Sequence, residues 1–432
     1  MRLLRKTNNE DKKVYWLGCI EIFKVKYISN INMKYKKYYV FGVQVYKKKY
    51  IIDFLGEKQF LKFLKTLQTS YKIILFFDHS LGGGTEKYFF GQLNSLKEKY
   101  IVLRFQYFNV IDNYRLILYY KDDLKYLQSY EISVLLSIIK EVNLNEVVIN
   151  NLVGYKKTLD ILEIVSELKQ TIWKNIKLSV RCHDFQGICP SFNLLNDQFT
   201  YCNVPDIRVC LKCFPKIKLS DNLYDHKILL SGADDIISWR KKWNDFFCDS
   251  VDEVVFFSNS TKDIFCKIYP ILKNKLVIIP HFVHKLRKAK IKEHSTINIA
   301  IIGKVNLIQK GKTIIEKMIS LTSNNKNIKI VIIGSFNYKK NCKNLSVTGR
   351  YKVEELPDIV EKTEIDIIFI PSICPETFSY VTSEAIMMDI PVACFNLGAQ
   401  AERVSIYNKG LVINEISAEA ALQESISFIK KK

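Results

Sequence analysis

The chain has 432 residues, of which 48% are hydrophobic, so it is long enough for two or three domains with substantial cores and too apolar to be disordered throughout. Its 65 Lys and Arg outnumber 44 Asp and Glu, which gives a formal net charge of +21. A charge of this sign suits an anionic partner such as nucleic acid, a membrane surface or a phosphorylated substrate.

Targeting and redox features of the sequence favour a cytosolic protein. No apolar run reaches the ~18 residues that a membrane helix needs, and the first residues, MRLLRKTNNEDKK, lack the apolar middle of a secretory signal. The 11 cysteines are an odd number and most lie in apolar segments, which indicates reduced thiols rather than a disulfide framework. We therefore expect a cytoplasmic protein, and the basic charge adds the expectation of peripheral binding to the inner face of a membrane.

Residues 1–56 are predicted to form a small β-hairpin appendage. The stretch 15–24 is echoed, with one residue fewer, by 39–47, and both copies are aromatic and β-branched with lysine clusters around them. Such a mixture suits contact with nucleic acid or lipid head groups. The alternative is a solubilised hairpin that packs on the main domain.

Residues 57–283 alternate between helix and strand patterns, which is typical of a parallel sheet. The first buried strand is followed by the Gly-rich turn DHSLGGGTE, where Gly83 and Gly84 would let the backbone approach a ligand and aim N–H groups at an anion. A plain flexible loop is the alternative. The patterns predict strands at 71–77, 100–108, 114–120, 146–151, 176–182, 254–258 and 276–280, and helices at 57–70, 131–142, 158–168, 228–248 and 260–268.

His183 and Asp184 follow the strand predicted at 176–182, and ligands bind at the carboxyl ends of strands in open α/β sheets. His183 is suited to donate a hydrogen bond to a sugar hydroxyl or a phosphate. The alternative is a turn histidine that is hydrogen-bonded to Asp184.

An insert at 184–215 contains four cysteines, the last two in a CxxC spacing. Four thiolates in a short loop can complete a tetrahedral Zn²⁺ site, and a structural zinc would order a loop too polar to fold alone. Zinc is therefore the first interpretation, with disulfides in an oxidising compartment and unligated thiols as alternatives. The predicted ligands are Cys189, Cys202, Cys210 and Cys213.

A basic stretch without apolar periodicity, 284–296, is predicted to be a linker, and a second series of strands and helices then fills 297–432. Its strands are predicted at 297–302, 328–333, 345–348, 365–370, 391–396 and 410–413, and its helices at 310–321, 353–361 and 418–429.

The stretch PSICPETFSYVTSE, at 371–384, lies between the strand at 365–370 and a helical pattern. Glu376 and Glu384 are eight positions apart, close to two helical turns, so both can line one cleft at the end of the strand. The amides of Thr377, Phe378 and Ser379 fall in the first helical turn, where unpaired N–H groups and the helix dipole suit a diphosphate. A capped surface helix with two solvated acids is the alternative.

This stretch resembles the paired-glutamate signature of family 4 retaining glycosyltransferases, the group 1 glycosyl transferases of GT-B fold. The resemblance implies that Glu376 contacts the donor sugar, that the three amides hold the diphosphate and that Glu384 binds the ribose. It covers about residues 71–432 and implies two Rossmann-like domains that face a cleft, with the β appendage in front.

Two further motifs resemble parts of the same family. Gly303-Lys304 and Lys310-Gly311 correspond to the pair of basic residues that clamps the diphosphate, although the family usually has Arg in the place of Lys304. The His-Asp pair at His183 resembles a branch in which it opens a cysteine-bearing insert, and this branch makes bacterial surface polysaccharides. Family members often end with a helix that crosses back to the first domain, whereas the helix at 418–429 is expected to belong to the second.

The resemblance implies a metal-independent hexosyltransferase that moves a sugar, with retention, from a nucleotide diphosphate sugar to a glycan. The implied acceptor is a lipid-linked glycan of O-antigen, lipopolysaccharide or capsule synthesis. The implied catalytic residues are Glu376, His183 and Lys310. The alternatives are a nucleotide-sugar epimerase of the same fold, an inactive glycan-binding protein and a nucleic-acid-binding protein. Nucleic acid is disfavoured as a partner, because the chain contains no recognised binding module.

Overall fold

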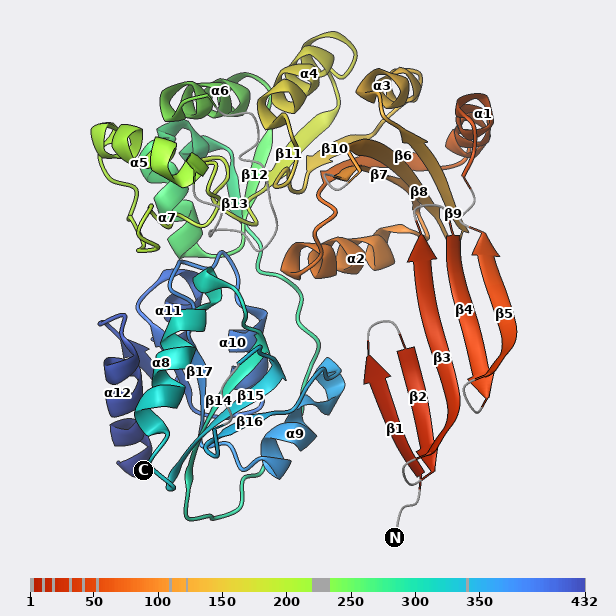
Figure 1. Cartoon of the computed structure of the whole chain (residues 1–432). Coiled ribbons are helices and arrows are strands. Elements are labelled where there is room, and N and C mark those ends of the chain that lie inside the picture. Colours follow the sequence, from red (N-terminus) through yellow and green to blue (C-terminus); the bar gives the residue numbers. More distant parts are fainter. Residues whose placement is uncertain are drawn as a thin grey trace. The chain divides into compact units, whose positions relative to one another are not determined.

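The computed structural model describes residues 54–431 except 109–110, 122, 220–233 and 339–341, together with the backbone of five strands that precede them (Figure 1). The chain divides into two compact units. The first comprises 1–73, 97–105 and 113–143, and the second comprises 74–96, 106–112 and 144–432. The predicted α/β class is confirmed, because the second unit contains two parallel sheets with helices between their strands.

The first unit contains a five-stranded antiparallel sheet in which each strand pairs with the next one along the chain. The predicted hairpin is therefore part of a longer meander. Gly18, Cys19, Phe41 and Gly42 of the predicted repeat lie outside the described residues. The strands are β1 (Leu4–Asn9), β2 (Lys12–Leu17), β3 (Ile20–Asn30), β4 (Met33–Val40) and β5 (Val43–Ile51).

The rest of the first unit consists of two amphipathic helices and antiparallel strands. Helix α1 (Glu57–Gln68) buries Phe60 and Leu64, which lie four residues apart on one face. Strand β7 (Tyr100–Phe108) belongs to this unit up to Phe105, and β8 (Asn113–Tyr120) pairs with β9 (Asp123–Ser129). Strand β9 was not predicted, because only one of its seven residues is fully buried. Helix α3 covers Ile132–Lys140.

The first α/β half of the second unit has five strands in the order β13-β12-β11-β10-β6. All four neighbouring pairs in this order are parallel, which agrees with the nearly continuous apolar run and burial of β6. The strands are β6 (Lys72–Asp78), β10 (Glu146–Ile149), β11 (Lys177–Arg181), β12 (Glu253–Phe256) and β13 (Leu276–Ile278). The helices are α2 (Gly84–Leu96), α4 (Thr158–Thr171), α5 (Ile207–Leu219), α6 (Ile236–Asp249) and α7 (Asn259–Ile268).

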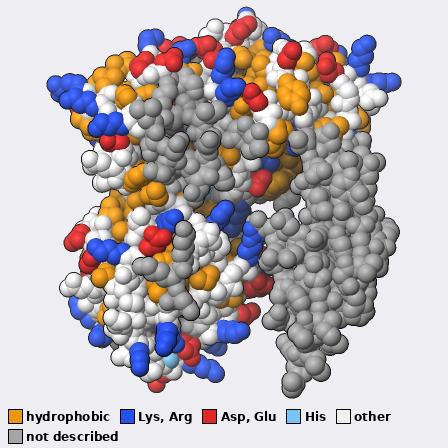
Figure 2. All heavy atoms as spheres, viewed as in Figure 1, with side chains coloured by type: hydrophobic (Ala, Val, Ile, Leu, Met, Phe, Trp, Pro, Cys, Tyr) orange, Lys and Arg blue, Asp and Glu red, His pale blue; other side chains and the backbone are white. Residues whose placement is uncertain are grey.

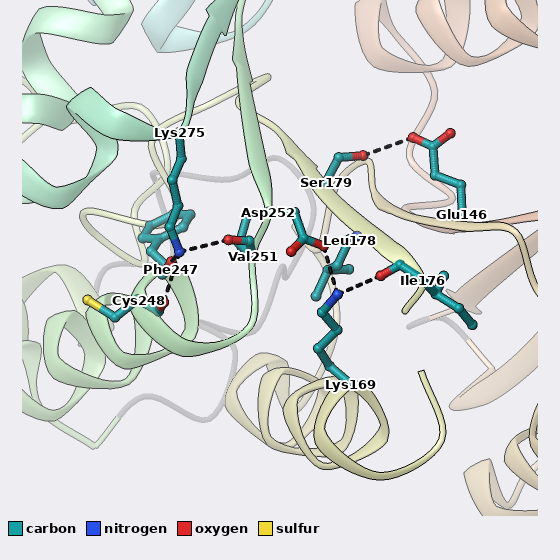
Figure 3. Close-up of polar contacts among 10 residues, drawn as sticks. All are labelled: Glu146, Lys169, Ile176, Leu178, Ser179, Phe247, Cys248, Val251, Asp252 and Lys275. Atoms are coloured by element: carbon teal, nitrogen blue, oxygen red, sulfur yellow. Dashed lines mark hydrogen bonds and ion pairs between the residues drawn. The ribbon is translucent and has the colours of Figure 1, made fainter. Parts of the chain in front are cut away.

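Lysine side chains fasten the helices to the amino-terminal ends of these strands (Figure 3). Lys275 Nζ donates to the carbonyl oxygens of Phe247, Cys248 and Val251 at 2.8–2.9 Å, at the end of α6. Lys169 Nζ, from α4, donates to Asp252 Oδ2 at 2.8 Å. A cation at a helix C-terminus satisfies carbonyls that have no partner in the helix. This edge of the sheet is therefore held by contacts that lie away from the strands' carboxyl ends.

The second α/β half is a six-stranded sheet in the order β16-β15-β14-β17-β18-β19, and every pair is parallel. Alternate residues of β14 enter two different cores, Ile299 and Ile301 on one face and Ala300 and Ile302 on the other. The strands are β14 (Ile297–Lys304), β15 (Ile328–Ser335), β16 (Leu345–Val347), β17 (Ile367–Ile370), β18 (Val392–Phe395) and β19 (Gly410–Ile413). The helices are α8 (Lys312–Thr322), α9 (Leu356–Lys362), α10 (Tyr380–Met387), α11 (Gly398–Val404) and α12 (Ala418–Lys430).

The chain runs from β14 outward to β16 and then returns to β17, which lies on the other side of β14. Ligands bind at such a reversal of strand order, beyond the carboxyl ends of the strands. The predicted linker contains no helix or strand, and within it the Ala289 N–H donates to Met388 O at 2.9 Å. Helix α12 packs against α8 and β19, so it contacts the second half, as expected from the sequence.

Candidate active site

A pocket of about 240 Å³ lies between the two α/β halves of the second unit. It is lined by the start of α2, the segment that follows β11, the turn before α8 and the segment between β17 and α10. Six of the residues that were singled out from the sequence line this pocket. They are Gly84, His183, Lys310, Glu376, Thr377 and Phe378.

Lys310 and Glu376 form an ion pair in the pocket, with Lys310 Nζ 2.5 Å from Glu376 Oε1. The Ser372 hydroxyl also donates to that oxygen, at 2.6 Å. Burial alone would raise the pKa of Glu376, but the charge and hydrogen bond of Lys310, with the hydrogen bonds of Ser372 and Ser379, outweigh burial and lower it. The carboxylate is therefore ionised and firmly placed.

A glycine behind Lys310 allows this arrangement. Gly311 has φ of +78°, and a Cβ atom there would lie 2.1 Å from the carbonyl oxygen of Pro371. The backbone after β14 can thus press against the backbone after β17 only where no side chain intervenes. The Ile373 N–H also donates to Gln309 O at 3.1 Å, so Lys310 and Glu376 sit on two segments that are directly joined.

Helix α11 holds the backbone of Glu376 from the other side. The fully buried Gln400 accepts the Glu376 N–H at 3.0 Å and donates to Cys374 O at 3.2 Å. Gly398, with φ of +57°, lies so close that a Cβ there would be 2.6 Å from Glu376 N. Gln400 was not predicted as a site residue, because its local signal is a single amide in an otherwise apolar helix face.

The amides proposed for the diphosphate precede the helix instead of forming its first turn, because α10 begins at Tyr380 and Ser379 is its N-cap. The Ser379 hydroxyl accepts the Thr382 N–H at 3.4 Å. Thr377 Oγ1 donates to His183 O at 2.7 Å. Thr377, Phe378 and Ser379 therefore lie just ahead of the positive end of the helix dipole, which still suits an anion.

His183 is oriented by a chain of side-chain hydrogen bonds. Asn150 Nδ2 donates to Asp78 Oδ1 at 2.9 Å, which leaves Asn150 Oδ1 to accept from His183 Nε2 at 3.0 Å. When His183 is neutral, its other nitrogen, Nδ1, is then an acceptor. Burial, followed by the neighbouring His281 and His79, holds the pKa of His183 well below its usual value. The hydrogen bond to Asp184 that was considered as an alternative is not formed, since Asp184 accepts from Asn151 and Gln186.

A second histidine that was not predicted as a site residue also lines the pocket. His281 is 8% exposed, and neither of its ring nitrogens has a hydrogen-bond partner among the described residues. Its ring centroid is 4.1 Å from that of Phe257 and 4.4 Å from that of Phe378. Burial lowers the pKa of His281 to about 3, so the ring is neutral at ordinary pH.

Glu384 is buried inside α10 and pairs with a lysine from the first α/β half. Lys87 Nζ lies 3.2 Å from Glu384 Oε1 and 4.2 Å from the centroid of the Tyr380 ring. Glu376 lines the pocket and Glu384 does not, so the pocket contains only one of the two glutamates that are expected from the sequence to line a common cleft. The sequence contains no local signal for Lys87, which is one lysine of many.

The remaining predicted donor-binding residues are not among those that line the pocket. Gly83 has φ of +82° and directly precedes Gly84 in the turn before α2. Gly303, with φ of +115°, and the exposed Lys304 stand at the end of β14. Of the two predicted phosphate-binding lysines, the structure therefore brings Lys310 into the pocket and leaves Lys304 outside it.

The predicted zinc site is not supported. Its four cysteines line a second pocket of about 320 Å³, but no group of His, Cys, Asp and Glu side chains among the described residues could hold a metal ion. Two of the four thiols accept hydrogen bonds from other side chains, because Ser191 Oγ donates to Cys189 Sγ and Arg240 Nη2 donates to Cys210 Sγ, both at 3.3 Å. Cys189, Cys202, Cys210 and Cys213 are all free thiols.

Comparison with known families supports the resemblance inferred from the sequence. Residues 282–432 match the family model described as Glycosyl transferases group 1. A sequence search of curated proteins finds no match to the chain. The family match therefore covers the part of the chain that carries Lys310, Glu376 and Glu384.

Solved structures match both α/β halves of the second unit. Anabaena Alr3699/HepE in complex with UDP-glucose aligns with a TM-score of 0.52 and 11% identity, over 84% of this chain and 90% of that one. The complex of the same protein with UDP aligns with a TM-score of 0.51 and 10% identity, over 83% of this chain and 90% of that one. Sucrose-phosphate synthase from Thermosynechococcus elongatus aligns with a TM-score of 0.52 and 11% identity, over 84% of this chain and 90% of that one. At such low identity these similarities show the fold alone, and the predicted GT-B fold is confirmed.

Proposed function

We propose that the chain is a retaining glycosyltransferase that transfers a hexosyl group from a nucleoside diphosphate sugar to a glycan hydroxyl. The observation that carries this proposal is the ion pair of Lys310 and Glu376 in a pocket at the carboxyl ends of β14 and β17. A carboxylate beside a cation, at the start of a helix, is suited to a substrate with hydroxyl groups on one side and a diphosphate on the other.

In the proposed reaction Glu376 positions the sugar, and Lys310 offsets the negative charge that develops on the departing diphosphate. The amides of Thr377, Phe378 and Ser379 would add donors for the same phosphates. His183 would accept a hydrogen bond from a sugar hydroxyl at Nδ1, instead of donating one as expected from the sequence, because its Nε2 donates to Asn150 Oδ1. Glu384 would bind the ribose. Because Lys310 already provides a cation beside the leaving group, we propose that transfer needs no metal.

The donor is best sought among UDP-sugars first, because one structurally similar protein, Alr3699/HepE, was solved in complex with UDP and with UDP-glucose. A panel of UDP-, GDP-, dTDP- and CMP-sugars should raise the melting temperature of the wild type with one nucleotide, and Glu384→Ala should lose that effect. If none of the sugars stabilises the wild type, the proposal is wrong. An assay with and without a glycan acceptor separates transfer from epimerisation, since an epimerase would convert the donor alone.

For the acceptor we propose a lipid-linked glycan of bacterial surface polysaccharide, with the protein bound peripherally to the membrane. Figure 2 shows Lys and Arg side chains spread over the described part of the visible face, among Asp and Glu, and the net charge is +21. None of the described helices has the length and apolarity needed to cross a membrane. Binding to liposomes should require anionic lipid and weaken as salt rises, and salt-independent binding would contradict this part of the proposal.

A further inference from the structure

Glu384 is a buried carboxylate that pairs with the partly exposed Lys87. The Glu384 side chain is 4% exposed and the Lys87 side chain is 34% exposed. Lys87 Nζ contacts both Glu384 Oε1, at 3.2 Å, and the face of Tyr380, at 4.2 Å. Because Lys87 is the more exposed member of the pair, it forms part of the cover over the carboxylate. We therefore expect a ligand hydroxyl that binds Glu384 to displace the Lys87 ammonium.

Lys87 belongs to the first turn of α2, which directly borders the pocket. Gly84 and Thr85, three and two positions before it, line the pocket. A Cβ atom on Gly84 would lie 3.6 Å from the Tyr380 ring, so this turn packs on the start of α10. When the Lys87 ammonium leaves Glu384, it therefore remains beside the pocket, where a flexible four-carbon stem can redirect it.

We propose that Lys87 is a donor-binding residue that exchanges one anionic partner for another. It neutralises Glu384 when the pocket is empty, and it pairs with the donor's phosphates when ribose hydroxyls take its place at Glu384. This inference rests on the proposed function, because it assumes a nucleoside diphosphate in the pocket. The exchange leaves neither group without a partner, because the hydroxyls hydrogen-bond to the carboxylate while the ammonium pairs with the phosphates, and a buried carboxylate without a partner is strongly destabilising.

The exchange can be tested by asking how much the phosphates contribute to binding. Calorimetry measures the dissociation constants of three pairs of ligands for the wild type and for Lys87→Met. The pairs are UDP and uridine, GDP and guanosine, and dTDP and thymidine. The ratio of the nucleoside constant to the diphosphate constant gives the phosphate preference. For the pair that binds, Lys87→Met should lower this preference about tenfold or more, while the nucleoside alone binds as well as before or more tightly.

Two matched variants distinguish this inference from a purely structural role. Lys87→Arg keeps the charge and should retain most of the phosphate preference. Lys241→Met removes an exposed lysine that pairs with Asp245 on α6, and it should leave both constants unchanged. Thermal unfolding without ligand shows whether each variant is folded.

Each possible result of these measurements leads to a different conclusion. If Lys87→Met weakens nucleoside and diphosphate by the same factor, Lys87 merely supports Glu384 and the exchange is wrong. If neither constant changes, Lys87 does not bind the donor. If the wild type binds none of the diphosphates, the proposed function fails first, and that failure is visible before any variant is made.

Discussion

Lys310 Nζ lies 2.5 Å from Glu376 Oε1, although 66 positions separate the two residues in the chain. Lys310 follows β14 and Glu376 follows β17, and these strands are neighbours at the point where the strand order reverses. The ion pair therefore forms because the topology places two strand ends side by side. A substrate in the pocket meets a cation and a carboxylate that already hold each other in place, which is the preorganisation that transfer from a charged donor requires.

Replacing the carboxylate of Glu376 by an amide should separate catalysis from donor binding. Glu376→Gln keeps the size of the side chain but removes the charge that fixes Lys310, so we expect kcat/KM to fall about 100-fold or more. The affinity for the free nucleotide should change far less, because Glu384 and the backbone amides remain. Steady-state kinetics and calorimetry measure the two effects, and Glu376→Ala should abolish transfer.

The matched control for this prediction is Glu354→Gln, which alters an exposed glutamate in the turn Val353–Glu355. Its kinetics should equal those of the wild type. Transfer by Glu376→Ala at the wild-type rate would refute the role assigned to Glu376.

Local patterns in the sequence were enough to predict the two glutamates and their surroundings. An apolar strand, a short polar segment and a helical pattern occur within 365–384, so the chain itself brings these groups to one edge of the sheet. Lys310 was predicted from the resemblance of Lys310-Gly311 to the family's pair of basic residues, and not from a local pattern of strand and helix. The contacts of Lys87, His281 and Gln400 could not be predicted, because each depends on segments far away in the chain. Lys87 and Glu384, for example, are 297 positions apart.

The cysteine insert shows a different limit. The spacing of four cysteines predicted a zinc site, but spacing along the chain does not determine how the sulfur atoms face one another. In the structure, Arg240 and Ser191 donate hydrogen bonds to two of the four sulfur atoms. Helix α5 was also missed, because it contains Pro215, and proline in a helical pattern normally indicates where the helix ends.

Adding one methyl group behind Lys310 should disturb the site. In Gly311→Ala the new Cβ would lie 2.1 Å from Pro371 O, at a φ of +78°, so the backbone must shift. We expect a loss of about 2 kcal/mol or more in the free energy of unfolding and a clear fall in kcat, because Lys310 moves with the turn. Denaturant unfolding and kinetics measure both.

The control for Gly311→Ala is Gly91→Ala. A Cβ on Gly91, inside α2, has no neighbour within 4 Å, so alanine should stabilise the helix by about 0.5–1 kcal/mol. If both variants behave alike, the close approach of Gly311 to Pro371 does not hold Lys310 in place.

Asp184 should make the stability of the protein depend on pH. Burial raises the pKa of Asp184 to about 6, although hydrogen bonds from Gln186 and Asn151 oppose the shift. A carboxyl whose pKa is higher in the folded state contributes stability below its ordinary pKa and loses that contribution as pH rises through about 6. Asp184→Asn carries no charge, so relative to the wild type it should gain about 1–3 kcal/mol between about pH 4 and about pH 7.5.

Denaturant unfolding of both proteins across this range tests the prediction for Asp184. The difference between them at a single pH also contains the altered hydrogen bonds to Asn151 and Gln186, so only its change with pH is decisive. A difference that stays constant with pH would show that Asp184 has an ordinary pKa.

Removing the ammonium of Lys275 should weaken the fold without altering the site. Its Nζ donates to three carbonyl oxygens around the end of α6, and Lys275→Met leaves these acceptors without their donor, which should cost about 1–3 kcal/mol of unfolding free energy. Lys273→Met, which removes an exposed lysine two positions earlier, should cost less than about 0.5 kcal/mol. Because Lys275 lies at the amino-terminal ends of the strands, kcat and KM measured well below the melting temperature should match the wild type in both variants.

Equal stability of Lys275→Met and Lys273→Met would show that the three hydrogen bonds contribute nothing to the free energy of unfolding. A lower kcat in Lys275→Met alone would show that the amino-terminal ends of the strands are coupled to the pocket.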